Sequence, residues 1–379
     1  MTVLSDAQPP STTSVPRGNR KRSAGDPGTS PMRPKFLPRQ VLVTRDAATQ
    51  SLTEEVVQRM RRWNVPVTQL KSNRLMGLKD DDPRREYARA KRTLALVNAP
   101  PGQFKLQPIP PSADYQFHLA QGCPAHCQYC YLAGSLTGPP ITRIYANLPD
   151  ILENLRNYAD DDRPRTFEAS CYTDPLAIEP WSGSLSKAVQ WFGEHARHTS
   201  ADAPGGLSLR WVTKFADVES LLPIAHRGAT QCRFSVNADE ATGKLEGGTA
   251  TVPQRLVAAR RLAEAGYPIG FVIAPIIPTK NWQTSYAELF DSIAAEMSPD
   301  VSMTFELITH RFTPKSRDVL LSWYPKTKLD LDETRRVTKR NKFGGEKYVY
   351  ASADMKSMRT WFECNIRDRF PSATVLYWT

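Results

Sequence analysis

The chain has 379 residues and a formal net charge of +11 at pH 7, with a mean hydropathy of -0.47 and a pI of about 9.4. No apolar run approaches the roughly 20 residues that span a bilayer, and residues 1–40 lack the apolar segment of a secretory signal. These features exclude a membrane-spanning chain and predict a globular, cytoplasmic protein without a membrane partner. The positive charge favours a polyanionic partner such as nucleic acid, although a basic tail and ordinary solubility would also account for it.

Residues 1–38 are rich in Pro, Ser, Thr, Gly, Arg and Lys and contain almost no large apolar side chains. Such a segment cannot bury enough apolar surface to offset the entropy of ordering it. We therefore expect a disordered basic tail. It either adds non-specific affinity for phosphates or is a dispensable extension.

Ordered structure is expected from residue 39, with a strand at 40–43 and helices at 52–63 and 84–94. A proline-rich extended stretch ends this N-terminal α/β segment at residue 112. The next segment alternates between the two element types. Its expected strands are 166–169, 209–213, 232–236, 269–273 and 302–308, and its expected helices are 148–158, 185–195, 218–224, 252–265 and 286–296.

Alternation of this kind is typical of βαβ units and a parallel sheet. We count about six units after the cysteines, fewer than the eight of a closed barrel, and assign the barrel to residues 113–312. The predicted fold class is therefore α/β, an open, partial (β/α)6 barrel. Residues 313–379 are charged and rich in turns, with a hairpin expected near 347–350, a helix at 355–370 and a strand at 374–378.

Three of the six cysteines, Cys123, Cys127 and Cys130, form a C-x3-C-x2-C motif. A disulfide framework is typical of small secreted chains, whereas closely spaced thiolates hold iron–sulfur clusters. Three ligands leave one iron of a [4Fe–4S] cluster open to the amino and carboxylate groups of S-adenosylmethionine (SAM). One electron from the cluster then releases a 5′-deoxyadenosyl radical, and the protein supplies position and exclusion of water.

A zinc site is the alternative interpretation of these cysteines. Structural zinc sites usually have four ligands in paired spacing. The sequence has no second cysteine pair, although His126 could be a fourth ligand. Tyr129, between the second and third cysteines, favours the cluster because its ring can pack on the cluster or on the adenine.

From about Pro38 to Thr379 the chain resembles the spore photoproduct lyase family. The blocks that carry the resemblance are Cys123 to Leu132, Phe167 to Cys171, Val212 to Phe215, Phe234 to Asn237, Ala265 to Val272, Phe305 to Thr313, Tyr324 to Leu329 and Lys347 to Tyr350. The resemblance implies light-independent repair of the DNA lesion 5-thyminyl-5,6-dihydrothymine. In that reaction the adenosyl radical abstracts hydrogen from C6 of the dimer, the methylene bridge breaks, and a thiol returns a hydrogen atom.

The resemblance also implies roles for individual residues. Cys171 is the hydrogen donor, and Tyr129 and Tyr131 belong to a radical relay. Lys214 pairs with the SAM carboxylate. The remaining positions are Ser235 and Asn237 at the ribose or methionine moiety, and Thr173 at the lesion. From the residues alone, Cys171 could equally be a small core side chain, the tyrosines packing groups and Lys214 a surface charge. The expected position of Cys171 at a strand end favours the donor role.

Two stretches depart from the family pattern. Tyr172 and Thr173 stand where Thr and Ser are usual, and Lys342 and Phe343 stand where an Arg-Tyr pair is usual. Lys keeps the charge but not the guanidinium fork. The basic stretch before this pair is still suited to phosphates. The predicted DNA-binding residues are Arg335, Arg336, Lys339, Arg340, Lys342 and Phe343.

The sequence leaves three functions to compare. The first is the lesion lyase, acting on DNA with an electron donor such as flavodoxin or ferredoxin. The second is a radical SAM enzyme with another nucleoside or a small molecule as substrate, favoured by Tyr172, Thr173 and Phe343. The third is a non-catalytic iron–sulfur protein that binds nucleic acid. Cys171 and Lys214 argue against the third, since a pure binder needs neither. The oligomeric state is left open.

Overall fold

Two mostly parallel sheets organise the chain in this computed structural model, which describes residues 34–136, 138–160, 162–195, 206–340 and 345–379. Residues 34–379 form one unit, and residues 1–33 of the expected tail lie outside the described part. The expected domain boundaries at 38, 112 and 312 stay predictions. Within the described ranges, no helix combines the length and the apolar character that crossing a bilayer requires.

The first sheet has the strand order β2-β1-β3-β7-β6 and is parallel except for β6. Its strands are β1 (Gln40–Val43), β2 (Val67–Gln69), β3 (Thr93–Val97), β6 (Ala120–Gln121) and β7 (Thr142–Tyr145). Two helices accompany it, α1 (Ser51–Arg62) and α2 (Pro83–Ala90). Leu52, Val56 and Met60 recur every fourth residue on α1 and are buried. The cysteine motif lies between β6 and β7, so this sheet fixes both ends of the segment that carries it.

The second sheet is a curled half-barrel with the order β15-β12-β11-β10-β9-β8-β5-β4. All neighbouring strands are parallel except the pair β4–β5. The strands are β4 (Gln107–Ile109), β5 (Ala113–Phe117), β8 (Arg165–Ala169), β9 (Leu207–Thr213), β10 (Thr230–Val236), β11 (Ile269–Ile276), β12 (Met303–Thr309) and β15 (Thr374–Trp378). The six strands from β5 to β12 confirm the predicted partial barrel, and β15 adds a further parallel strand.

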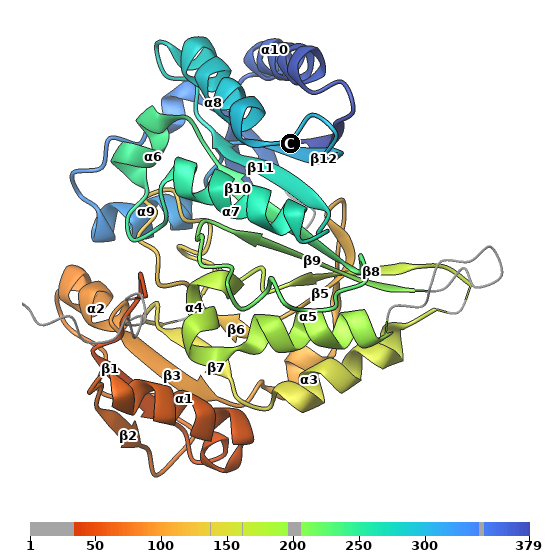
Figure 1. Ribbon diagram of the computed structural model, residues 1–379. Helices are drawn as coiled ribbons and strands as arrows, with labels where there is room; N and C mark the ends of the chain where they lie inside the picture. The colour runs from red at the N-terminus through yellow and green to blue at the C-terminus, as the bar shows by residue number, and fades with distance from the viewer. Residues whose placement is uncertain (1–33, 137, 161, 196–205, 341–344) are drawn as a thin grey trace, which may run out of the picture. The chain divides into compact units, whose positions relative to one another are not determined.

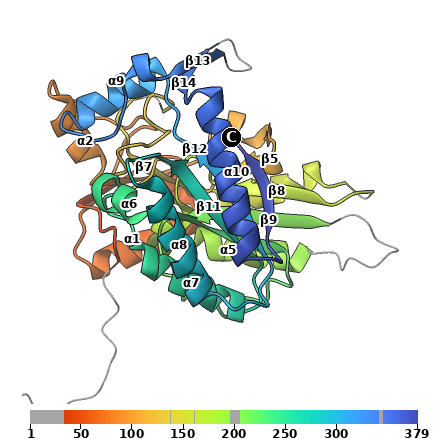
Figure 2. The same cartoon turned by 90° about the horizontal axis from the view of Figure 1, so that it is seen from above.

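Helices lie along one side of this sheet (Figures 1 and 2). The helices of this part are α3 (Leu148–Asn154), α4 (Pro175–Ser182), α5 (Ser184–His195), α6 (Asp239–Leu245), α7 (Val252–Glu264), α8 (Trp282–Glu296), α9 (Pro314–Trp323) and α10 (Ser352–Arg369). Large apolar side chains of the strands pack under them; for example, Phe305 of β12 contacts Phe290 of α8. Because side chains alternate along a strand, the other face is free to carry polar groups into the barrel interior.

Two predicted helices differ in the structure. Residues 218–224 form turns rather than a helix, because Pro223 has no N–H to continue a helical ladder. The helix expected to reach Leu94 ends at Ala90. Thr93–Val97 instead pairs with β1 on one side and β7 on the other, and these sheet contacts outweigh helix propensity.

The predicted C-terminal hairpin is present as β13 (Val337–Arg340) paired antiparallel with β14 (Glu346–Val349). Two backbone hydrogen bonds between Phe312 and Tyr348, of 2.8 and 3.3 Å, attach this ribbon to the segment that follows β12. The ribbon is therefore anchored at the carboxyl end of the half-barrel.

Candidate functional site

The predicted site residues gather where the parallel strands end. Cys171 follows β8, Lys214 follows β9, Ser235 lies near the end of β10, and Asn237 follows it. Carboxyl ends of parallel strands meet on one rim of the sheet, which is where catalytic groups collect in such folds. We call this edge the carboxyl rim.

The cysteine loop, residues 122–130, is held at the rim by backbone hydrogen bonds. Gly122 has φ +81°, and a side chain there would overlap the carbonyl of Ile141. Its N–H donates to the Tyr172 carbonyl at 2.8 Å. On the other side, the N–H groups of His126 and Gln128 donate to the carbonyls of Gly247 and Leu245 at 2.7 and 2.8 Å.

The three cysteines of this loop are free thiols, with Cys127 buried and the other two half-buried. Burial raises the pKa of the Cys123 thiol to about 12 and also raises that of Cys127. Thiols with raised pKa values become thiolates, the form that binds metal, only when a positive charge comes close to them. Across the described ranges, no three His, Cys, Asp or Glu side chains converge on a point that one metal ion would fill. The three thiols come from one short loop, and closely spaced thiolates of this kind are the ligands of iron–sulfur clusters.

His126, the candidate fourth zinc ligand, has its Nδ1 3.1 Å from the hydroxyl of Tyr87 on α2. Lys91, at the end of the same helix, donates to the Cys123 carbonyl at 2.5 Å and also to the carbonyl of Ala125. Lys91 is buried and braces the loop from behind. The sequence analysis missed it, because nothing near Lys91 in the chain indicates a contact 32 residues away.

Cys171 follows a constrained residue, because Ser170 is buried and has φ +61°, a region that non-glycine residues rarely adopt. Two hydrogen bonds hold Ser170. Its N–H donates to the Phe117 carbonyl at 2.7 Å, and its hydroxyl accepts from the Leu119 N–H at 3.0 Å. Burial, and then the charge of Glu168, raise the pKa of the Cys171 thiol. The side chain therefore stays an S–H group at neutral pH.

The Tyr131 hydroxyl donates to the Cys171 carbonyl, although 66% of the Tyr131 surface is exposed. The structure thus brings a tyrosine of the cysteine segment onto the predicted donor residue. The relay role of Tyr131 is not established by this contact and stays a prediction.

Tyr172 and Thr173, which differ from the usual residues of the family, both contact other residues of this chain. The Tyr172 ring packs against His118, with the ring centroids 4.8 Å apart. The Thr173 hydroxyl donates to the Gly122 carbonyl and is buried. Thr173 therefore ties the Cys171 loop to the cysteine loop, and its contact with a lesion stays a prediction.

Lys214 and Tyr129 share one carboxylate, that of Glu246. Its oxygens accept from the Tyr129 hydroxyl and from Arg255, and lie 3.5 Å from the Lys214 ammonium. Although burial alone would raise it, Lys214 and Arg255 hold the pKa of Glu246 below its usual range. Lys214 also donates to the Ser235 hydroxyl. The sequence analysis missed Glu246 and Arg255.

Asp174 supports the site from α4, and the sequence analysis did not single it out. It caps α4, and its carboxylate accepts from the Thr213 hydroxyl and the Lys214 N–H, both at 2.7 Å. Burial raises the pKa of Asp174, although these hydrogen bonds oppose the rise. This residue sets the direction in which the chain leaves β9 and thereby positions Lys214.

Asn237 is fully buried, and hydrogen bonds occupy its amide. It donates to the Pro275 carbonyl at 2.7 Å and accepts from the Tyr286 hydroxyl at 2.7 Å and the Ala238 N–H at 3.0 Å. These contacts join the ends of β10 and β11. Contact with the ribose or methionine moiety stays a prediction for this residue.

The basic residues before the ribbon turn divide into two kinds. Arg335, Lys339 and Arg340 are exposed. The Arg336 guanidinium instead lies 3.8 Å from the Tyr350 ring centroid and donates to the His310 carbonyl at 3.2 Å. Lys342 and Phe343 lie outside the described residues.

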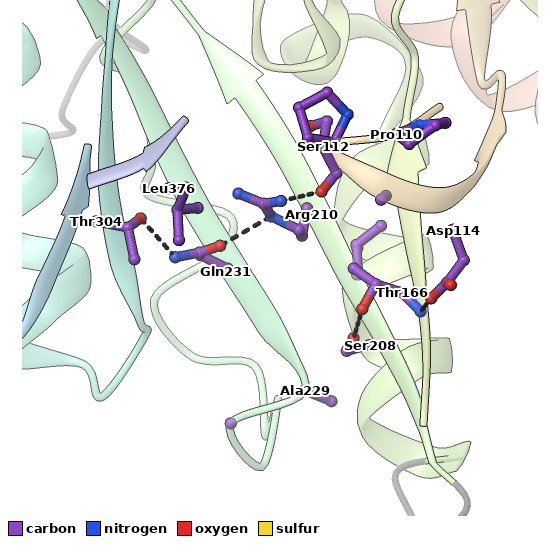
Figure 3. Close-up of a pocket in the computed structure, with 14 residues that line it drawn as sticks. Pro110, Ser112, Asp114, Thr166, Ser208, Arg210, Ala229, Gln231, Thr304 and Leu376 are labelled. Carbon is purple, nitrogen blue, oxygen red and sulfur yellow. Dashed lines mark hydrogen bonds between the residues drawn. The ribbon is translucent and has the colours of Figure 1, made fainter. Parts of the chain in front are cut away.

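The opposite, amino end of the half-barrel holds an open pocket of about 550 Å³. Polar side chains from the strand starts line it, including Thr166, Ser208, Gln231 and Thr304, together with Asp114 (Figure 3). Gln231 accepts from Arg210 at 2.9 Å and donates to Thr304 at 3.0 Å.

Farther along the strands lies a buried ion network. Glu306 accepts from Arg233 at 2.8 and 2.9 Å, from Tyr377 and from Arg210. Arg233 also pairs with Glu168. Arg210, which lines the pocket, is part of this network, so the charges lie between the pocket and the carboxyl rim.

A half-barrel of six successive parallel strands, with a loop of three cysteines and a half-buried lysine at its carboxyl rim, defines a radical SAM enzyme. The spore photoproduct lyase family model matches residues 36–379. Spore photoproduct lyase from Geobacillus sp. is 37% identical, covering 91% of this chain and 99% of the relative. The enzyme from Bacillus subtilis is 35% identical, covering 92% and 100%. This chain belongs to the spore photoproduct lyase family.

Solved structures agree with this assignment. A variant of spore photoproduct lyase with bound AdoMet and dinucleoside spore photoproduct superposes with a TM-score of 0.84 at 35% identity, covering 91% of this chain and all of the other. Spore photoproduct lyase complexed with dinucleoside spore photoproduct alone gives the same score, identity and coverage. The likeness therefore extends over the half-barrel and the first sheet.

Proposed function

We propose that this protein is a radical SAM lyase that repairs spore photoproduct, 5-thyminyl-5,6-dihydrothymine, in DNA. The observation that carries the proposal is the position of Cys171, a protonated thiol at the carboxyl rim whose loop is bonded to the cysteine loop through Gly122 and Tyr172. Structures of relatives that hold AdoMet and the dinucleoside lesion support the same substrate.

Cys123, Cys127 and Cys130 would hold the [4Fe–4S] cluster. Lys214 would bind the SAM carboxylate, and Ser235, which accepts a hydrogen bond from Lys214, would share that contact. When bound, the cluster and SAM supply one-electron chemistry that yields a carbon-centred radical. Glu246 would hold the Lys214 ammonium and the Tyr129 hydroxyl at one carboxylate oxygen, Oε1, while its other oxygen accepts from Arg255.

The Cys171 thiol would return the hydrogen atom at the end of the reaction. Only the protonated S–H form carries a hydrogen atom, and burial with the Glu168 charge keeps it protonated by raising its pKa. The Ser170 conformation and the Tyr131 hydroxyl fix the backbone of Cys171 from two sides. This fixed backbone would present the thiol to the same point of the substrate in each turnover.

DNA would approach over the ribbon β13–β14, which is anchored on the same rim. Arg335, Lys339 and Arg340 would contact phosphates, which position a duplex without reading its sequence. A damaged and poorly paired base is cheap to extrude, so the lesion can leave the stack and reach the rim. An electron donor such as flavodoxin or ferredoxin completes the proposal, and the cytoplasmic location stays a prediction.

A different substrate is the alternative that Tyr172, Thr173 and Phe343 favour. Phe343 lies outside the described residues, and the bulk of Tyr172 stands beside the donor cysteine. The Tyr172 ring packs on buried His118, and this packing accounts for its bulk without a new substrate. Thr173 keeps its hydroxyl engaged with Gly122. The two departures therefore stabilise the rim, and the lesion remains the substrate we propose.

A single assay tests the function. Protein reconstituted with iron and sulfide is supplied with SAM, dithionite and a dinucleotide that carries the lesion. We expect thymine monomers, and an intact lesion alongside released 5′-deoxyadenosine would favour another substrate instead.

The donor role has its own test. Cys171→Ala should still cleave SAM but should lose clean thymine formation and give radical adducts with buffer or reductant. Cys364→Ala, which removes a half-buried thiol on α10, is the matched control and should behave like the parent. An unchanged product distribution in Cys171→Ala would refute the donor role.

A further inference from the structure

The proposed function requires one electron to reach the cluster from outside. We propose that α2 and the loop before it, residues 70–90, form the docking surface for a small, acidic one-electron carrier protein. The inference rests on the proposed function, because a cluster that is never reduced needs no carrier. We call residues 70–90 the α2 face.

The inner side of α2 touches the cysteine loop directly. The Tyr87 hydroxyl lies 3.1 Å from Nδ1 of His126, and Lys91 donates to the Cys123 carbonyl at 2.5 Å. An α-helix with its side chains is about 10–12 Å across. The exposed side of α2 is therefore about one helix thickness from the segment that holds the cluster ligands.

Other contacts of the cysteine loop are committed to the reaction. Gly122 is bonded to Tyr172, next to Cys171, and Tyr129 belongs to the network with Glu246 and Lys214. SAM and the lesion would occupy this side, and the DNA ribbon stands on the same rim. A carrier protein that delivers an electron while substrate is bound must reach the cluster from another surface. The exposed side of α2 is such a surface.

The composition of the α2 face matches a protein partner. Residues 70–90 contain six basic and four acidic residues, a net charge of +2. Met76 belongs to this face and has 72% of its surface exposed. Arg89 donates to the carbonyls of Gly77 and Lys79, both at 3.4 Å, and so holds the Met76 loop against the helix. The exposed basic side chains are Lys71, Arg74, Lys79, Arg84, Arg85 and Arg89.

A polynucleotide is a poorer fit to this face. Asp82 pairs with Arg84 and Arg85 at 3.6 and 3.4 Å, and Asp80 pairs with Arg89 at 3.0 Å. These carboxylates would repel phosphates, whereas an acidic protein can turn its charges toward the arginines and cover Met76. Opposite net charges accelerate such an encounter, and an exposed methionine adapts to an apolar contact.

The test reverses two charges on the outer side of α2 in the full-length holoenzyme. Arg84→Glu/Arg85→Glu should leave the fold intact, because acidic residues are favourable in the first turn of a helix. Arg359→Glu/Arg367→Glu on α10 is the matched control. The reversed side chains are 65% and 75% exposed in the test pair, and 57% and 73% in the control.

The probe is an acidic flavodoxin. We expect the test pair to weaken its binding to the protein at least tenfold by calorimetry and to slow cluster reduction by reduced flavodoxin by a similar factor. Reduction by dithionite, which needs no docking, should be unchanged. A second variant, Met76→Asp, should weaken flavodoxin binding without changing the arginines.

Several outcomes would overturn the proposal. These are equal flavodoxin binding in the test and control pairs, a larger loss in the control, no flavodoxin binding by the parent, or a loss of duplex DNA affinity in place of flavodoxin affinity. None of these measurements uses lesion turnover. A protein that is reduced through α2 but leaves the lesion intact would refute the proposed function and keep the docking surface.

Discussion

The strands of the half-barrel carry polar groups in different ways along their length and at their carboxyl ends. Along the strands, Arg210 and Arg233 meet Glu168 and Glu306 in a buried network that balances its own charge. At the carboxyl rim, loops hold the polar groups and rest on contacts such as the left-handed Ser170. The difference shows that a strand can serve stability along its length and chemistry at its end, two residues or so farther on.

The largest effect is expected when one of the proposed cluster ligands is removed from the carboxyl rim. Cys127→Ala should abolish SAM cleavage and the EPR signal of the reduced cluster, because the loop loses its buried central thiol. The secondary structure should remain, since backbone hydrogen bonds to Gly247 and Leu245 hold the loop. Iron content, circular dichroism and 5′-deoxyadenosine release measure the three effects. Normal iron content with normal cleavage would contradict the ligand assignment.

A change in the buried ion network should lower the stability of the protein and leave the chemistry at the rim intact. Glu306→Ala removes the carboxylate shared by two arginines and leaves buried positive charge unpaired. Breaking a buried ion pair in this way costs about 3–5 kcal/mol of the free energy of unfolding, which denaturant titration measures. Cluster loading and SAM cleavage per folded molecule should stay close to the parent.

The control for Glu306 is Glu264→Ala on α7. Its carboxylate is 60% exposed and pairs with Arg260 at 2.6 Å, so we expect a loss of no more than about 1 kcal/mol. Equal losses at the two positions would mean that the buried network does not hold the barrel together.

DNA binding can be compared in the same way, between the β13–β14 ribbon and the amino end of the half-barrel. Neutralising two phosphate contacts with Lys339→Gln/Arg340→Gln should reduce the slope of log affinity against log salt by about 2, since each contact contributes about 0.9. Arg163→Gln, just before β8 and 63% exposed, is the control at the amino end and should leave the slope unchanged. An equal change in both variants would show that the rim does not direct DNA binding.

A dependence of stability on pH is also expected to arise at the rim. His118 follows β5 and His310 follows β12, and burial lowers the pKa of these side chains to about 4 and about 3. Between pH 6.5 and about 4 the unfolded chain therefore takes up protons that the folded chain refuses. The free energy of unfolding is therefore highest above pH 6.5. It falls as the pH drops, by up to about 1.4 kcal/mol per histidine and pH unit.

His310→Gln should remove its share of this slope, which denaturant titrations at pH 7 and pH 5 measure. Arg336 adds to the lowered pKa of His310, so Arg336→Met should retain most of the slope because burial is the larger cause. A variant of His310 with the parent slope would contradict the assignment.

Much of the architecture could be predicted from the sequence because its signals are local. The alternation of strands and helices over 166–308 predicts the partial barrel, and the expected strands lie within or close to β8 to β12. The cysteine spacing likewise predicts a ligand loop, since three thiols within eight residues share one turn of chain. Where a proline interrupts the pattern, as at Pro223, the prediction was wrong.

The support around the site could not be predicted in this way. Lys91 reaches Cys123, Thr173 reaches Gly122, and Glu246 reaches Tyr129 across 117 residues. Hydrogen bonds over such separations leave no periodicity in the sequence. For the same reason Asn237, expected at the cofactor, could not be foreseen as the link between the ends of β10 and β11.

The cysteine loop begins and ends in the first sheet, at β6 and β7, yet its backbone partners Tyr172, Leu245 and Gly247 belong to the half-barrel segment. The segment that carries the three cysteines is therefore tied to both sheets at once. A substitution that shifts one sheet against the other would move the three thiols even when it lies far from them in the chain.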